Sequence, residues 1–99
     1  MNIKMNTIKF DADRKLIQFV QNKVKKLSKF FDDIMGAEVY LKLENTQDTD
    51  NKVVEIIVEI PGSNLFSRKQ SKTFEESTDM AVDALKLQLI KHKEKIRGL

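Results

Sequence analysis

The sequence predicts an α+β domain of two layers, in which two helices cover one face of a four-stranded mixed sheet. Three observations lead to this fold class. The chain has 99 residues, which suits a single domain spanning residues 1–99. Its segments follow the periods of strands and helices in the order β-α-β-β-β-α. Only one face of the predicted sheet is strongly apolar, so both helices are expected to pack there.

The first strand is expected over residues 2–10. Ile3 and Met5 alternate with polar neighbours, and the next apolar pair, Ile8 and Phe10, resumes the alternation out of phase. A slip of this kind predicts a β-bulge or bend near Asn6.

The first helix follows Asp13, which is a good N-cap residue. Apolar side chains then recur at helical spacing, which predicts a helix of about 18 residues with one apolar face. We expect it to stop near Asp33–Gly36, with Gly36 in the left-handed position that ends many helices. The residues of the apolar face are Leu16, Val20, Val24, Leu27 and Phe31.

Three further strands are expected next. Residues 37–45 and 52–60 alternate inward and outward side chains, as half-buried strands do. The polar, acidic segment Asn45–Asn51 between them predicts a mobile hairpin loop. A Pro-Gly turn follows, and the polar segment 64–72 is expected to form an edge strand.

The last helix is expected to run to about Arg97, with Gly98 as its stop. Thr73 and Glu76 have the spacing of a capping box at its start. The side chains that fall within one arc, and are expected to face the core, are Phe74, Thr78, Val82, Leu85, Leu89, His92 and Ile96.

This order of elements fixes the expected sheet. The first two strands are joined by a helix, so they should be parallel with a right-handed crossover. The last three strands should form an antiparallel meander. The sheet face away from the helices should be acidic and wet, since it carries Glu38, Glu44, Glu55 and Glu59.

The charge of the chain is unevenly distributed. The net charge is +3, from 18 basic and 15 acidic residues. The segment from Asp32 to Gly62 has eight acidic and two basic residues, a net charge of −6, and the rest of the chain carries +9. This asymmetry favours a surface that faces a polyanion.

The basic residues gather on the two predicted helices, which makes them candidate contacts to the phosphates of a structured RNA. A solvated helix face is the simpler alternative, but such faces usually mix both signs. The stem of Lys23 is expected to lie on Phe19 or Phe30, and basic residues of the edge strand are expected to extend the surface. The candidate RNA-binding residues are Lys23, Lys25, Lys26, Lys29, Arg68, Lys69, Lys86, Lys91, His92, Lys93, Lys95 and Arg97.

Several function classes find no support. Cysteine is absent, and His92 is the only histidine, flanked by two lysines, so no catalytic pair is visible. We therefore expect no enzyme, no cofactor, no metal and no small-molecule substrate, and a packing role or an RNA contact for His92. No apolar run suits a membrane span or a signal peptide, which favours a cytoplasmic protein without a membrane partner.

One feature of the last helix stands apart from this scheme. Met80, Leu87 and Ile90 fall outside its expected core arc. They are expected either to pack against the first helix or to form a small apolar patch for a partner.

Two segments resemble the ribosome hibernation promoting factor family, which includes the ribosome-associated inhibitor called protein Y. They are Gln18–Asn45 and Asp83–Gly98, and the most specific run is QLIKHKEK, Gln88–Lys95. The resemblance implies the β-α-β-β-β-α fold, which is similar to double-stranded-RNA-binding domains. It also implies binding to the small ribosomal subunit in stationary phase or stress, in the channel for mRNA and tRNA, so that translation is blocked by occupancy.

The resemblance also assigns individual positions. Lys23 and Lys26 match basic positions of the family's first helix, and Asp79 matches an acidic position of its second. Glu75 stands where the family usually has an aromatic residue. The chain resembles the short form of the family, without its dimerisation domain, and is expected to be monomeric when free. The positions matching the basic end of the family's second helix are Lys91, His92, Lys93, Lys95 and Arg97.

Two other functions remain open from the sequence. The first is a protein-interaction module that uses the acidic sheet face or the apolar helix patch. The second is a general binder of structured RNA. The sequence does not decide whether ribosomes are only silenced or also paired into dimers.

Overall fold

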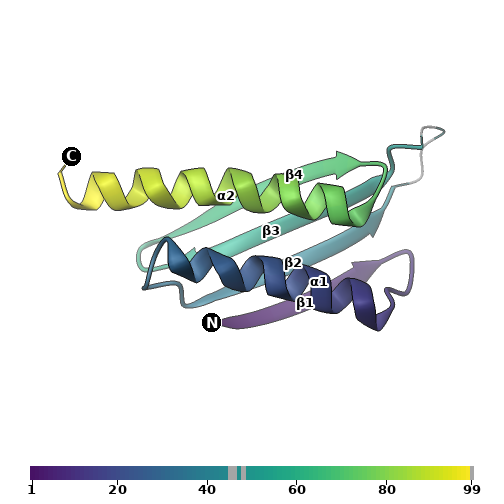
Figure 1. Cartoon of the computed structure of the whole chain (residues 1–99), viewed down its shortest axis with the longest axis horizontal. Helices are drawn as coiled ribbons and strands as arrows, with labels where there is room; N and C mark the ends of the chain where they lie inside the picture. Colours follow the sequence, from purple (N-terminus) through teal and green to yellow (C-terminus); the bar gives the residue numbers. More distant parts are fainter. Residues whose placement is uncertain (45–46, 48, 99) are drawn as a thin grey trace.

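A four-stranded sheet with the strand order β1-β2-β3-β4 forms one layer of the molecule, and two helices form the other (Figure 1). The computed structural model describes residues 1–44, 47 and 49–98, so the predicted loop Asn45–Asn51 lies partly outside the described residues. The elements are β1 (Asn2–Ile8), α1 (Arg14–Lys25), a 3₁₀-helix η1 (Lys26–Lys29), β2 (Gly36–Leu43), β3 (Lys52–Ile60), β4 (Ser63–Ser71) and α2 (Phe74–Ile96).

The topology agrees with the predicted fold class. Strands β1 and β2 are parallel, and β2, β3 and β4 form an antiparallel meander with β4 at the edge. Figure 1 shows α1 and α2 side by side on the same face of the sheet, running in the same direction. The apolar face of the sheet is therefore covered by helices, and the opposite face, called the open face below, is uncovered.

The core lies between the sheet and the two helices. The helices contribute Val20, Val24 and Leu27 from one side of this layer and Leu85 and Leu89 from the other, all with no exposed surface. Alternate residues of the two central strands, β2 and β3, complete the core. These strand residues are Val39, Leu41, Val54, Ile56, Val58 and Ile60.

The end of β1 differs from the prediction. The pairing of β1 with β2 runs without interruption, so the predicted bulge near Asn6 is wrong. The strand ends at Ile8, and Lys9 adopts a left-handed backbone with φ of 70°. This turn brings Phe10 back to the core, where its ring stacks on Phe74 with centroids 4.7 Å apart. The slip in the apolar pattern therefore marks a strand end rather than a bulge.

The first helix begins as predicted, because the Asp13 carboxylate accepts a hydrogen bond from the Leu16 amide at 2.8 Å. Its end is different. After 12 residues the α-helix tightens into η1, where the Ser28 hydroxyl donates to the Lys25 carbonyl at 2.8 Å. Hydrogen bonds of this kind, from a serine side chain to a carbonyl of the preceding turn, slightly destabilise α-helices and often bend them. The single helix of about 18 residues is therefore an α-helix followed by a 3₁₀ turn.

Gly36 has another role than the predicted one. It is the first residue of β2, and among the described glycines only Gly62 and Gly98 have positive φ. A Cβ at Gly36 would lie 3.1 Å from the Asn2 carbonyl oxygen of the neighbouring strand. Gly36 is thus needed for the close approach of β1, and it does not cap the helix.

Both ends of α2 follow the prediction. The Thr73 hydroxyl accepts from the Glu76 amide at 3.0 Å, and Gly98 has φ of 72° at the C-terminal end. The expected core arc is too long, however, because Ile96 is 64% exposed. The C-terminal turns of α2 extend past the sheet in Figure 1, so no strand lies beneath them. In the described part of the chain, no helix is long and apolar enough to span a membrane.

A seam of small polar residues joins the first half of α2 to the sheet edge. The hydroxyls of Ser71 and Ser77 lie 2.7 Å apart and are buried. Ser77 donates to the Lys52 carbonyl at 2.7 Å, and Ser71 donates to the Thr73 carbonyl at 2.9 Å. Two hydroxyl groups thus donate to partly buried carbonyl groups where larger apolar residues would hold the helix farther away.

Ser77→Ala is expected to lower the free energy of unfolding by about 1–3 kcal/mol, because buried carbonyl and hydroxyl groups lose a partner. Ser28→Ala is the matched control, since Ser28 is exposed and its loss should change stability by less than about 0.5 kcal/mol. Urea denaturation of both variants measures the difference. Equal stabilities would contradict the importance of the seam.

Candidate nucleic-acid interface

The helix layer carries most of the basic candidates, and they gather toward one end of it. Residues 14–29 contain six basic residues and no acidic one, and residues 86–97 contain five basic residues and only one acidic one. Because the helices run in the same direction, their C-terminal ends lie at the same end of the molecule (Figure 1). Lysines in the last turns also interact favourably with the negative end of each helix dipole. Stabilisation of the helix therefore explains the presence of some of these lysines.

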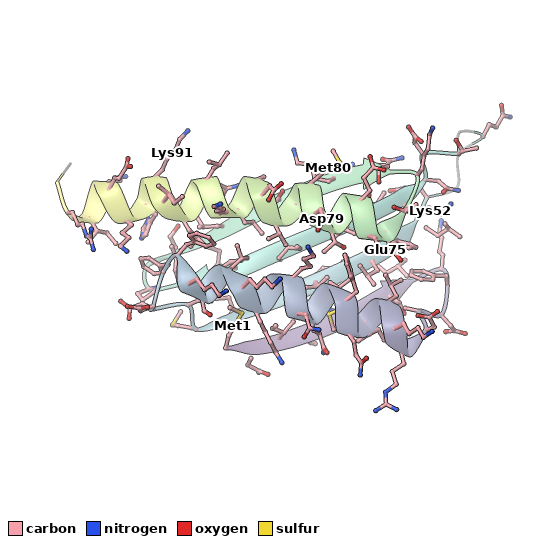
Figure 2. The ribbon with its side chains drawn as sticks, viewed as in Figure 1. Met1, Lys52, Glu75, Asp79, Met80 and Lys91 are labelled. Carbon is pink, nitrogen blue, oxygen red and sulfur yellow. The ribbon has the colours of Figure 1, made fainter. Side chains whose placement is uncertain are left out.

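The two helices are linked by an ion pair. Lys23 Nζ lies 3.1 Å from a carboxylate oxygen of Asp79, which lies between the helices in Figure 2. The Lys23 ammonium also lies 5.4 Å from the centroid of the Phe19 ring, as predicted for one of its two possible aromatic neighbours. Since the side chains are 34% and 51% exposed, the pair contributes at most about 1 kcal/mol. Its main effect is to fix and partly neutralise Lys23.

Farther along the two helices the contacts between them are aromatic. Lys86 Nζ lies 4.8 Å from the centroid of the Phe30 ring, so a cation–π contact joins α2 to the end of η1. His92 packs edge-on against Phe31 with ring centroids 5.4 Å apart. The packing role expected for His92 is confirmed, and a contact of His92 with RNA stays a prediction.

A hollow of about 330 Å³ lies where η1 ends and α2 continues. Sequence reasoning missed it, although the helical spacing from Lys86 through Ile90 and Lys93 to Arg97 places these residues on one flank. This hollow, called the η1–α2 pocket below, combines an apolar floor with a basic rim. It is lined by Lys29, Phe30, Ile90, Lys93, Glu94 and Arg97.

The other flank of α2 faces away from α1. Met80 and Lys91 point to this side in Figure 2, and Leu87 is 60% exposed. The expected patch of three apolar residues is therefore wrong, because Ile90 lies in the η1–α2 pocket instead. The alternative prediction, packing against the first helix, fits Ile90 only, next to Phe30 at the end of η1.

Arg68 is not part of the helix surface, which corrects the predicted extension along the edge strand. It lies on the open face, where its guanidinium binds Glu55 at 3.1 Å and Glu44 at 3.0 Å. Its neighbour Lys69 has the opposite orientation in the alternating strand and lies on the helix side. Of the two candidates on β4, only Lys69 adjoins the basic helices.

The open face is less acidic than predicted. Glu55 is bound by both Lys42, at 3.0 Å, and Arg68. The face also holds apolar surface, since Phe66 is 50% exposed and pairs with the half-buried Ile57 of β3. Two of its four predicted carboxylates, those of Glu44 and Glu55, are thus paired with cations, and the face is not purely acidic.

Tyr40 lies on the open face and makes a hydrogen bond that changes its pKa. Its hydroxyl donates to Glu38 at 2.7 Å. This hydrogen bond is the main cause that raises the pKa of Tyr40 above 10.0, followed by desolvation and by the negative charges of Glu38 and Glu55.

Among the residues that the structure describes, no group of three or more His, Cys, Asp and Glu could hold a metal ion.

Residues 3–97 match the sequence model of the family described as sigma 54 modulation protein / S30EA ribosomal protein. The chain belongs to this family. The match covers both helices and all four strands, so the resemblance carried by the first and last helices is confirmed for the domain as a whole.

Curated relatives in the family are ribosome hibernation promoting factors. That of Pseudomonas putida is 27% identical over 99 residues, covering 100% of this chain and 93% of the relative. That of Escherichia coli K12 is 28% identical over 97 residues, covering 98% and 96%. The Bacillus subtilis ribosome hibernation promotion factor is 27% identical, and the match covers 97% of this chain but 50% of that longer protein.

Solved structures show the same fold. A ribosomal subunit interface protein from Coxiella burnetii superposes with a TM-score of 0.83 at 22% identity, covering 94% of this chain and 98% of the other. The N-terminal domain of Thermus thermophilus protein Y superposes with a TM-score of 0.79 at 24% identity, covering 93% and 99%. The β-α-β-β-β-α arrangement is therefore shared with both of these proteins.

The Tyr40 hydroxyl is expected to ionise above the usual pH for tyrosine, because ionisation breaks its hydrogen bond to Glu38 and brings two negative charges together. Glu38→Gln should lower this pKa toward 10.0, and Glu59→Gln on the same face should leave it unchanged. The chain has one tyrosine and no tryptophan, so phenolate absorbance during an alkaline titration reports Tyr40 alone. A pKa that does not respond to Glu38→Gln would contradict the contact.

Proposed function

We propose that this S30EA-family protein binds the small ribosomal subunit through ribosomal RNA and silences translation during stationary phase or stress. The observation that carries the proposal is the basic helix layer, whose cations gather toward the C-terminal ends of α1 and α2, at the same end of the molecule. The curated relatives named ribosome hibernation promoting factors support the same conclusion.

The chemistry of this layer suits RNA read by shape and backbone. Lysine and arginine side chains neutralise phosphates and release counterions, whatever the base sequence. The exposed candidates Lys25, Lys26, Lys29, Lys91 and Lys95 are free of ion pairs among the residues that the structure describes. Lys23 is different, because Asp79 already binds it.

The proposed mechanism is steric. The bound domain occupies the channel that mRNA and tRNA would use, so no bond is made or broken and neither a cofactor nor a small-molecule substrate takes part. The free protein is proposed to be a cytoplasmic monomer. The folded body, 46 Å long with extents of 24 and 19 Å in the other directions, supplies the bulk that such a plug needs.

The combined change Lys26→Glu, Lys91→Glu and Lys93→Glu is expected to weaken binding to small subunits by at least about 100-fold at low salt, because cations facing phosphates become anions. All three positions are on the helix layer and are at least partly exposed, so the fold should persist. Co-sedimentation with purified small subunits measures the affinity, and circular dichroism checks the fold.

A second triple variant separates local charge from net charge. Lys4→Glu, Lys9→Glu and Lys52→Glu makes the same change in net charge at positions outside the two helices that are at least partly exposed. Its affinity should fall by less than about 10-fold, since only long-range attraction is lost. Equal losses for the two triple variants would reject the helix layer as the binding surface.

Binding is also expected to depend steeply on salt. If about six phosphates are neutralised, the logarithm of the affinity should fall with the logarithm of the salt concentration at a slope of about −4 to −5. Sedimentation with small subunits across a range of potassium chloride concentrations gives this slope. A lack of binding even at low salt would refute the proposed function, and a flat dependence would refute the phosphate contacts.

A further inference from the structure

The η1–α2 pocket differs from the rest of the basic surface because it is hollow and partly apolar. Phe30 and Ile90 line its floor and are half-buried, and Lys29, Lys93 and Arg97 surround it. A convex lysine-rich surface is sufficient for phosphates, so a built hollow with an aromatic wall indicates a ligand with both a flat apolar part and a negative charge.

The pocket exists because two elements of different length meet there. The chain leaves the first helix at Phe30, after the 3₁₀ turn of η1, whereas α2 continues to Ile96. The last turns of α2 therefore extend beyond both the first helix and the sheet (Figure 1). Lys86 holds the Phe30 ring in place from α2, at 4.8 Å from the ring centroid.

The acceptor groups of the pocket argue against a bare phosphate inside it. Glu94, an acidic residue, is among those that line the pocket. The helix C-terminus nearby adds the negative end of a dipole. A carboxylate and carbonyl groups instead accept hydrogen bonds from the amino group of a nucleobase, as Glu does from cytosine. The basic rim then lies at the position where the phosphate of the same nucleotide would emerge.

We propose that the η1–α2 pocket binds a single unstacked nucleotide of the ribosomal RNA, with its base against Phe30 and Ile90 and its phosphate on the Lys29, Lys93 and Arg97 rim. Sequence-selective RNA recognition commonly takes such splayed bases against aromatic side chains. The inference rests on the proposed function and adds to it a site that reads a base, where the surrounding lysines read only the backbone.

Filling the pocket tests this inference without a change of charge. Ile90→Trp places a large side chain in the pocket, and Phe66→Trp is the control, at an exposed apolar position on the open face away from the helix layer. Because stacking of one base contributes a sizeable part of binding, Ile90→Trp should weaken binding to small subunits by about 10-fold or more. Phe66→Trp should stay within about twofold of the wild type, as expected for an exposed position outside the binding surface.

The outcomes separate the two proposals. If the wild type binds and Ile90→Trp binds equally or more tightly, the pocket inference is wrong and the proposed function stands. If the wild type itself does not bind, the proposed function fails. Thermal unfolding of both tryptophan variants excludes a loss of fold as the cause of weak binding.

A second measurement needs no ribosome. Cytidine or adenosine 5′-monophosphate at millimolar concentration should shift the Ile90 methyl and Phe30 ring signals in NMR spectra, whereas ribose 5-phosphate, which lacks the base, should not. Equal shifts with ribose 5-phosphate would show a phosphate site and overturn the base assignment. No shift with any nucleotide would overturn the pocket as a preformed nucleotide site.

Discussion

The structure depends on one constraint, that the sheet has a single apolar face and both helices must cover it. The parallel pairing of β1 with β2 makes α1 a crossover helix, and the edge strand β4 leads directly into α2. Both helices consequently run in the same direction across the same face (Figure 1). The basic side chains of their C-terminal ends are thereby brought to one end of the molecule, although they are about 60 residues apart in the chain.

The contact between α2 and the sheet changes in character along the helix. At its start, the buried hydroxyls of Ser71 and Ser77 let the helix lie close to the sheet edge, and Phe74 stacks on Phe10. Toward its end the sheet is no longer beneath it, and Ile96 is exposed. The helix is thus anchored at one end and available to a partner at the other. The η1–α2 pocket is a consequence of this overhang.

Electrostatics separates the two faces of the molecule. On the open face, Arg68 and Lys42 bind the carboxylates of Glu44 and Glu55, so the charges largely balance. On the helix layer, Asp79 binds Lys23, but residues 14–29 contain no acidic residue and residues 86–97 contain only one. The modest net charge of the chain therefore conceals a strongly basic layer that suits a polyanion.

The sequence alone determined the order of elements, the helix caps at Asp13 and Thr73, and the basic character of both helices, because these depend on periodicity and local hydrogen bonds. It also carried the resemblance that the family match confirms. The tertiary structure decided on which face of the molecule each side chain lies and which side chains it meets there. Arg68 is next to Lys69 in the sequence but points to the open face, because the strand register decides this. Ile90 joins Phe30 in a pocket, because α2 extends beyond the end of the first helix.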